Sequence, residues 1–98
     1  MQLQDYIPKI DKEYRKIIFS GISFDSSKVK KNEIFFAIKG TKIDGNNFIS
    51  EALKKGSKII VTEKKTKKTK KGILYINTKN IRKLLAEVSF KIYKKKPK

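Results

Sequence analysis

The sequence stretch that decides the fold is Ile34-Phe35-Phe36-Ala37-Ile38, which Lys39-Gly40 closes. Its residues are apolar without the polar alternation of a half-exposed strand. A short run of this kind is typical of a strand that is buried on both faces of a sheet. The stretch therefore predicts a buried strand at 34–38, and the neighbouring segments are interpreted from it outward.

Further strands and helices are predicted on both sides of this run. Apolar alternation predicts a strand before it, and β-branched runs predict two strands after it. Two apolar stripes with helical spacing predict helices, the first of which joins strand 34–38 to the next strand as a right-handed crossover. The ranges are 17–24, 58–62 and 73–77 for the strands, and 47–55 and 78–93 for the helices. This order predicts an α/β fold, a small mixed β-sheet with helices packed on it.

The remaining segments are predicted to be irregular or short. Residues 1–16 have helical apolar spacing that Pro8 interrupts, so we expect one or two helical turns. The Lys- and Thr-rich run 64–71 is interpreted as a mobile surface loop. The residues expected at the helix ends are Asn46 or Asn47, Gly56, and Thr78 or Asn80.

Composition limits the class of protein. A chain of 98 residues is expected to form one domain. With no Cys and no His, no disulfide forms and a zinc site is not expected, so the prediction for metal ligands is none. No apolar run is long enough to cross a membrane, and the first residues do not resemble a secretory signal. A cytoplasmic protein without membrane contacts is the simplest inference.

The net charge of +17 raises the question of nucleic-acid binding. Only Arg15 and Arg82 are arginines, whereas nucleic-acid readers depend on Arg for bidentate contacts. The densest basic run, 64–71, has no aromatic residue on which a base could stack. We interpret the excess charge as a solvated Lys surface. A freestanding basic nucleic-acid-binding module is the rival hypothesis from another class.

Four short motifs occur in order along the middle of the chain. They are Asp25-Ser26-Ser27, the run 34–40, Asp44-Gly45-Asn46-Asn47-Phe48, and Ala52 with Gly56. In this order and spacing they resemble the N-terminal domain of the Mur ligases, the peptidoglycan-precursor ligases, and most closely that of the MurE type. The MurF type has a related N-terminal domain and is the nearest alternative.

The resemblance implies a role in binding the uridine diphosphate end of a nucleotide-linked substrate, UDP-N-acetylmuramoyl-L-Ala-D-Glu. It implies that Ser26 donates its hydroxyl to the substrate and that Phe24 lines the uracil pocket. It also implies that Thr41, Lys42 and Ile43 contact the nucleotide, largely through backbone groups. Such contacts suit uracil, which has a defined donor and acceptor edge, and a diphosphate, which favours hydroxyls, N–H groups and a cation such as Lys42.

The chain departs from the family pattern at several positions. Ser27 replaces the usual Arg of Asp-Ser-Arg, and Asn46 replaces a His. Asn32 replaces a Gly, but Asn tolerates the same left-handed conformation. Asp25 is interpreted as a turn residue rather than a ligand contact.

The phosphate-binding glycine loop that an ATP-dependent ligase requires does not occur in the sequence. We therefore predict no catalytic residues and no cofactor in residues 1–98, and expect no ATP turnover from them alone. The resemblance implies that they are the N-terminal domain of a longer ligase, whose ATP-binding and C-terminal domains use ATP and Mg²⁺. Whether that ligase adds diaminopimelate or lysine is not encoded in this domain.

Overall fold

The computed structural model describes residues 1–7, 10–38, 48–64, 69–70 and 72–95. Within these ranges the strands are β1 (Gly21–Ser23), β2 (Glu33–Phe36), β3 (Ile59–Thr62), β4 (Thr69–Lys70) and β5 (Ile73–Asn77). The α-helices are α1 (Ile49–Lys54) and α2 (Ile81–Lys95), and two short 3₁₀ helices, Leu3–Asp5 and Lys12–Tyr14, precede the sheet.

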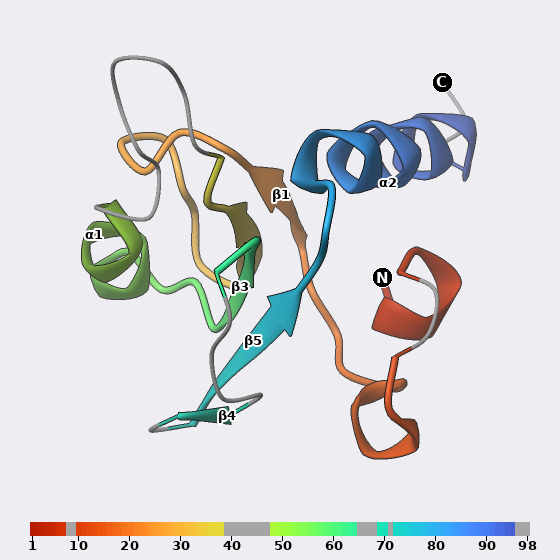
Figure 1. Cartoon of the computed structure of the whole chain (residues 1–98), viewed down its shortest axis with the longest axis horizontal. Coiled ribbons are helices and arrows are strands. Elements are labelled where there is room, and N and C mark those ends of the chain that lie inside the picture. The colour runs from red at the N-terminus through yellow and green to blue at the C-terminus, as the bar shows by residue number, and fades with distance from the viewer. Residues whose placement is uncertain (8–9, 39–47, 65–68, 71, 96–98) are drawn as a thin grey trace.

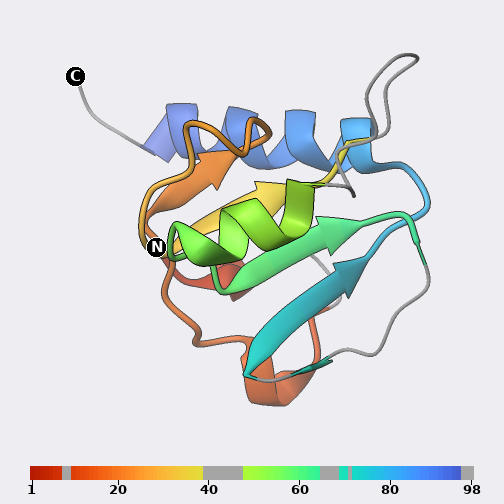
Figure 2. The same cartoon turned by 90° about the vertical axis from the view of Figure 1, so that its left-hand side faces the viewer.

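The strands of the described residues form one sheet in the order β1-β2-β3-β5-β4. β1, β2, β3 and β5 pair in parallel, and β4 runs antiparallel at the edge beside β5 (Figures 1 and 2). The predicted mixed α/β sheet is confirmed. Because four strands are parallel, their carboxyl ends lie along the same edge of the sheet, which is where ligands bind in many α/β folds.

Helices cover both faces of the sheet. In Figure 1, α1 lies on one side of the strands, whereas α2 and the N-terminal segment lie on the other. The alternation of side chains along β2 explains this arrangement. Ile34 and Phe36 belong to the larger core cluster, which contains residues of α2, and Phe35 belongs to the smaller cluster, which contains Ala52 of α1. All three β2 side chains are at most 1% exposed, so the predicted buried strand is confirmed.

The N-terminal segment is part of the larger core. Leu3, Tyr6 and Ile7 are buried, and the Tyr6 and Phe19 rings meet edge to face with centroids 5.4 Å apart. The Lys91 ammonium of α2 donates to the Tyr6 carbonyl oxygen at 3.3 Å. The predicted short amphipathic start is therefore confirmed, and it packs under α2.

The first predicted strand, 17–24, is wrong in its extent, because β1 includes only Gly21–Ser23. The backbone before it pairs with the N-terminal segment instead: the Phe19 N–H donates to the Met1 carbonyl oxygen at 2.8 Å. Gln2 and Ile18 form an isolated antiparallel bridge. The apolar alternation over 17–24 does reflect extended backbone, but the part before β1 pairs with the N-terminal segment rather than with the sheet.

The interpretation of 64–71 as a loop is wrong at Thr69–Lys70, which form the antiparallel edge strand β4. A two-residue strand without apolar residues leaves no periodic signal, because backbone pairing with β5 is enough to define it. Residues 65–68 and 71 lie outside the described part of the chain.

The N-terminal turn of α2 is held by two side chains. The Asn80 Oδ1 accepts a hydrogen bond from the Lys83 N–H at 3.1 Å, which confirms Asn80 as a cap. The Glu63 carboxylate accepts from the Ile81 N–H at 2.8 Å. Glu63 is far from the helix in sequence, so local patterns did not indicate it.

The start of α1 differs from the prediction. Phe48 occupies the N-cap position and makes no side-chain hydrogen bond to the helix. The predicted caps Asn46 and Asn47 lie outside the described residues. The helix is only six residues long, and burial of Ala52 against the sheet fixes its position.

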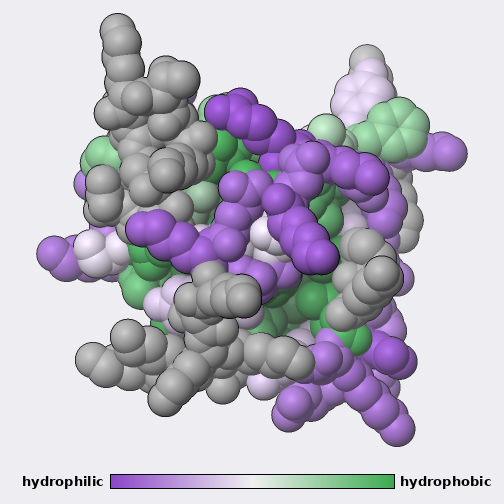
Figure 3. Space-filling view, in the orientation of Figure 1, coloured by the Kyte–Doolittle hydropathy of each residue, from purple (hydrophilic) through white to green (hydrophobic). Residues whose placement is uncertain are grey.

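Hydrophilic side chains are prominent on the surface. Among the coloured atoms of Figure 3 they predominate, with hydrophobic patches between them. No helix in the described ranges has the length and apolarity that crossing a membrane requires.

Two residues with left-handed backbone join the starts of β2 and β3. Asn32 has a φ of 66°, as the comparison with a family Gly predicted, and Gly56 has a φ of +104°. The Asn32 N–H donates to the Gly56 carbonyl oxygen at 3.0 Å. A Cβ on Gly56 would lie 3.0 Å from the Lys31 Cα, so both conformation and space favour Gly there.

We expect Gly56→Ala to destabilise the fold more than Gly72→Ala. Gly72 also has a positive φ, +79°, but a Cβ there would meet nothing within 4 Å. Gly72→Ala should therefore cost about 1–2 kcal/mol from backbone strain alone. Gly56→Ala should cost at least about 1 kcal/mol more because the Lys31 backbone must shift. Urea unfolding of both variants measures the difference, and equal losses would contradict the close contact.

Candidate functional site

A cavity of about 920 Å³ opens at the carboxyl edge of the sheet. Its walls come from the loop after β1, the end of β2, the start of α1 and the first turns of α2. The described residues that line it are Phe24, Asp25, Ser26, Ser27, Phe35, Ile38, Phe48, Glu51, Arg82, Leu85, Ala86 and Ser89. Segments far apart in sequence therefore meet at one site.

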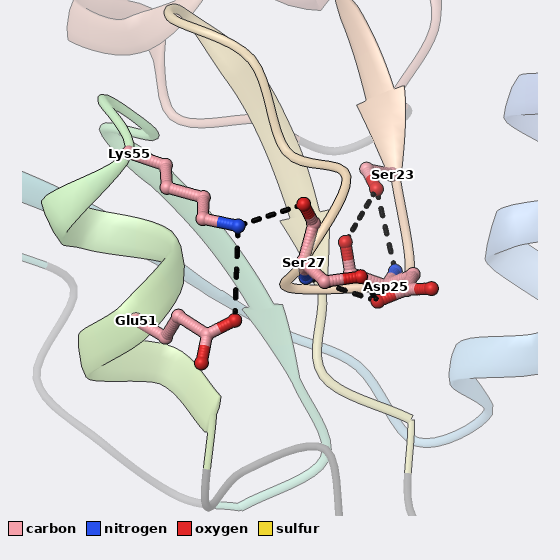
Figure 4. Close-up of polar contacts among 5 residues, drawn as sticks. All are labelled: Ser23, Asp25, Ser27, Glu51 and Lys55. Carbon is pink, nitrogen blue, oxygen red and sulfur yellow. Dashed lines mark hydrogen bonds and ion pairs between the residues drawn. The ribbon is translucent and has the colours of Figure 1, made fainter.

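The loop after β1 is braced by its own polar groups (Figure 4). The Asp25 Oδ1 accepts hydrogen bonds from the Ser27 N–H at 2.9 Å and the Ser27 hydroxyl at 2.7 Å. The Ser23 hydroxyl donates to the Asp25 carbonyl oxygen at 3.1 Å. The hydrogen bonds from the Ser27 side chain and backbone lower the pKa of Asp25 below its ordinary value. The interpretation of Asp25 as a turn residue is confirmed.

Helix α1 is tied to this loop by Lys55. The Lys55 ammonium donates to the Ser27 carbonyl oxygen at 2.7 Å and lies 3.9 Å from the Glu51 carboxylate (Figure 4). Lys55 thus joins the end of α1 to the loop that carries Ser26. The sequence suggested no such role, because Lys55 is one lysine among many.

Two of the predicted site residues lie on the cavity. Ser26 is 9% exposed, and within the described part of the chain its hydroxyl has no hydrogen-bond partner. Phe24 is 65% exposed, a large fraction for an aromatic side chain. A hydroxyl and an aromatic ring are therefore both available to a ligand here. The other predicted site residues, Thr41, Lys42 and Ile43, lie outside the described residues.

The cavity also includes residues that the sequence did not identify as site residues. Phe48 is 36% exposed at the start of α1, and Arg82 is exposed on the first turn of α2. The signal that could have found Arg82 is topological. A helix that follows a parallel strand begins at the carboxyl edge, beside the loop that follows β1.

Comparison with known proteins gives the same family for sequence and fold. The family model described as "Mur ligase family, catalytic domain" matches residues 18–93. A UDP-N-acetylmuramoyl-L-alanyl-D-glutamate–2,6-diaminopimelate ligase of Rickettsia prowazekii is 41% identical over 78 residues, which cover 80% of this chain and 16% of the relative. The ligase of the same name from Clostridium tetani is 39% identical over 101 residues, covering 95% and 20%.

Among solved structures, the MurF ligase of Thermotoga maritima in complex with ADP aligns with a TM-score of 0.58 and 29% identity. The alignment covers 69% of this chain and 15% of that one. The chain belongs to the Mur ligase family. Within that family its sequence relatives are 2,6-diaminopimelate ligases, the MurE type, whereas the MurF likeness is one of structure. The chain spans at most a fifth of the length of these relatives.

We expect Ser27→Ala to raise the pKa of Asp25 toward its ordinary value of about 3.9. The Ser27 hydroxyl is the main cause of the lowered pKa. Because the pKa is lower in the folded protein, Asp25 stabilises the fold above about pH 4. That contribution is lost as the pH falls through the folded pKa. A ¹³C NMR titration of the carboxyl carbon measures the shift, and an unchanged pKa would contradict the hydrogen bond.

Lys55→Met should reduce stability by about 1 kcal/mol, because the Ser27 carbonyl oxygen loses a charged donor on a partly exposed surface. Lys54→Met is the matched control, since Lys54 is exposed on the same helix and does not reach the loop. We expect its effect to stay within about 0.5 kcal/mol. Urea unfolding compares the two variants. Equal stability of both would show that Lys55 does not hold the loop.

Proposed function

We propose that residues 1–98 form the N-terminal, substrate-binding domain of a longer ligase of the MurE type. In this proposal the cavity holds the uridine diphosphate end of UDP-N-acetylmuramoyl-L-Ala-D-Glu. Membership of the Mur ligase family supports the proposal, as do relatives whose names specify UDP-N-acetylmuramoyl-L-alanyl-D-glutamate. We further propose that the longer protein is cytoplasmic and adds diaminopimelate, the amino acid in the names of those relatives.

The observation that carries the proposal is the meeting of Ser26 with exposed aromatic rings at one cavity. The Ser26 hydroxyl can both donate and accept a hydrogen bond, and no described residue occupies it. Phe24 and Phe48 expose ring surface there, which suits a flat base. No buried side-chain oxygen or nitrogen of the described residues lacks a hydrogen-bond partner, so the Ser26 hydroxyl is reached by water, which a ligand bound here can replace. The site therefore favours a ligand with a planar base and polar groups.

The role of this domain is to position the substrate. Asp25 and Lys55 hold the loop around Ser26 through hydrogen bonds to Ser27, which favours one position of the Ser26 side chain. In the longer ligase, ATP and Mg²⁺ would activate a substrate carboxylate for attack by an amino group. Among the described residues no group of His, Cys, Asp or Glu side chains gathers that could hold a metal ion.

Isothermal titration with UDP and ADP tests the proposal on the 98-residue chain. The two ligands carry the same diphosphate, so a difference between them reports contacts to the base rather than the attraction of a +17 chain for anions. We expect UDP to bind more tightly than ADP at 150 mM salt. Equal affinity for the two nucleotides would overturn the proposal.

Ser26→Ala should weaken UDP binding by about threefold to tenfold, the effect of losing one hydrogen bond to the ligand. Ser50→Ala is the control, because Ser50 is an exposed serine on α1 that does not line the cavity. We expect it to bind UDP like the unaltered chain. Equal UDP affinities of the Ser26 and Ser50 variants would exclude Ser26 from the site.

A further inference from the structure

The charged side chains that line the cavity differ in whether they have a partner within the protein. Among the described residues that line it, Asp25, Glu51 and Arg82 are charged. The Asp25 carboxylate accepts two hydrogen bonds from Ser27, and Glu51 pairs with Lys55. The Arg82 guanidinium has no hydrogen bond or ion pair within the described part of the chain, and it therefore lies beyond ion-pair distance of both carboxylates. It is the cation that the described wall leaves available to a ligand.

The backbone around Arg82 is anchored by its neighbours on α2. Arg82 follows Ile81, whose N–H is held by the Glu63 carboxylate at 2.8 Å and whose side chain is buried. The next turn is anchored by Leu84, also buried in the larger core. Because Ile81 and Leu84 are buried in the core, the exposed Arg82 side chain lines the cavity from an anchored turn. Little ordering of the backbone would be needed when a ligand binds.

The two carboxylates and the guanidinium come from different elements. Asp25 belongs to the loop after β1 and Glu51 to α1, whereas Arg82 belongs to α2, and the two helices lie on opposite faces of the sheet (Figure 1). A phosphate group is repelled by the carboxylates and attracted by the guanidinium. The field inside the cavity therefore gives an anionic ligand a preferred orientation.

We infer that Arg82 binds the phosphate groups of the nucleotide, on the α2 side of the cavity, while Ser26 contacts the ligand from the β1 loop. This inference rests on the proposed function and adds the residue that recognises the diphosphate. A guanidinium offers several N–H donors in a planar fork, which matches phosphate oxygens in a bidentate contact. Arg82 is thus a binding residue whose contribution depends on the phosphates and not on the base.

The test compares UDP with uridine in the Arg82→Gln, Arg82→Lys and Lys83→Gln variants. We expect Arg82→Gln to weaken UDP binding by about tenfold, the loss of a charge-assisted contact, and to leave uridine binding unchanged. Arg82→Lys keeps the charge without the fork, so its loss should be smaller. Lys83 is an exposed neighbour that does not line the cavity, and Lys83→Gln should bind UDP like the unaltered chain.

An NMR measurement on the unaltered chain tests the same inference without any substitution. Arg15 and Arg82 are the only arginines, so their side-chain Nε–H signals form a set of two. The Arg15 Nε donates to the Ile10 carbonyl oxygen, away from the cavity. We expect UDP to shift the Arg82 signal and not the Arg15 signal, and uridine to shift neither.

The outcomes separate this inference from the proposed function. If UDP binds selectively over ADP but Arg82→Gln retains full UDP affinity, Arg82 is not the phosphate contact and the proposed function stands. An equal loss in Arg82→Gln and Lys83→Gln would assign the effect to overall charge and overturn the inference. If the unaltered chain does not distinguish UDP from ADP, the proposed function fails and the inference fails with it.

Discussion

The burial of β2 on both faces is the constraint on which the rest of the structure depends. Ile34 and Phe36 pack into the core beneath α2, and Phe35 packs beneath α1, all nearly or fully inaccessible to water. Fully burying such side chains contributes about 1.5–3 kcal/mol each. A strand buried in this way needs a neighbour on each edge and a helix layer on each face. Its parallel pairing with β1 and β3 then brings the loop after β1 and the starts of both helices to one edge.

At the cavity, the polar groups of the loop after β1 fall into two kinds: those that hydrogen-bond within the protein and one that does not. Asp25 and Ser27 satisfy each other, and Lys55 satisfies the Ser27 carbonyl oxygen. Ser26 lies between them and is left without a partner among the described residues. If none of the polar groups in this loop had a hydrogen-bond partner, the loop would rearrange. If all of them had one, no donor or acceptor would be left for a ligand. The observed pattern fixes the loop and leaves one hydroxyl available.

Local patterns in the sequence were sufficient where structure is decided locally. The strand 73–77 matches β5 as predicted, and Asn80 caps α2 because its side chain acts on the turn that follows it. Interactions between distant segments gave no such signal. Glu63, which follows β3, accepts a hydrogen bond from the start of α2. The N-terminal segment forms backbone hydrogen bonds with the residues before β1. The positions of Phe24 and Ser26 on the cavity were predicted from family resemblance. The position of Arg82 there follows only once the order of the strands in the sheet is known.

The surface and the cavity differ in the way they attract anions. The Lys-rich surface gives a net charge of +17, an attraction that is unspecific and is screened within about 10 Å at moderate salt. The cavity has two carboxylates and one guanidinium on its described walls, so net charge alone does not draw a phosphate into it. A nucleotide that enters must gain from directed contacts, namely a hydroxyl, aromatic surface and a guanidinium fork. These contacts act at short range, where added salt screens them less than it screens the exposed lysines. The basic surface and a selective site are therefore compatible, because they operate at different distances.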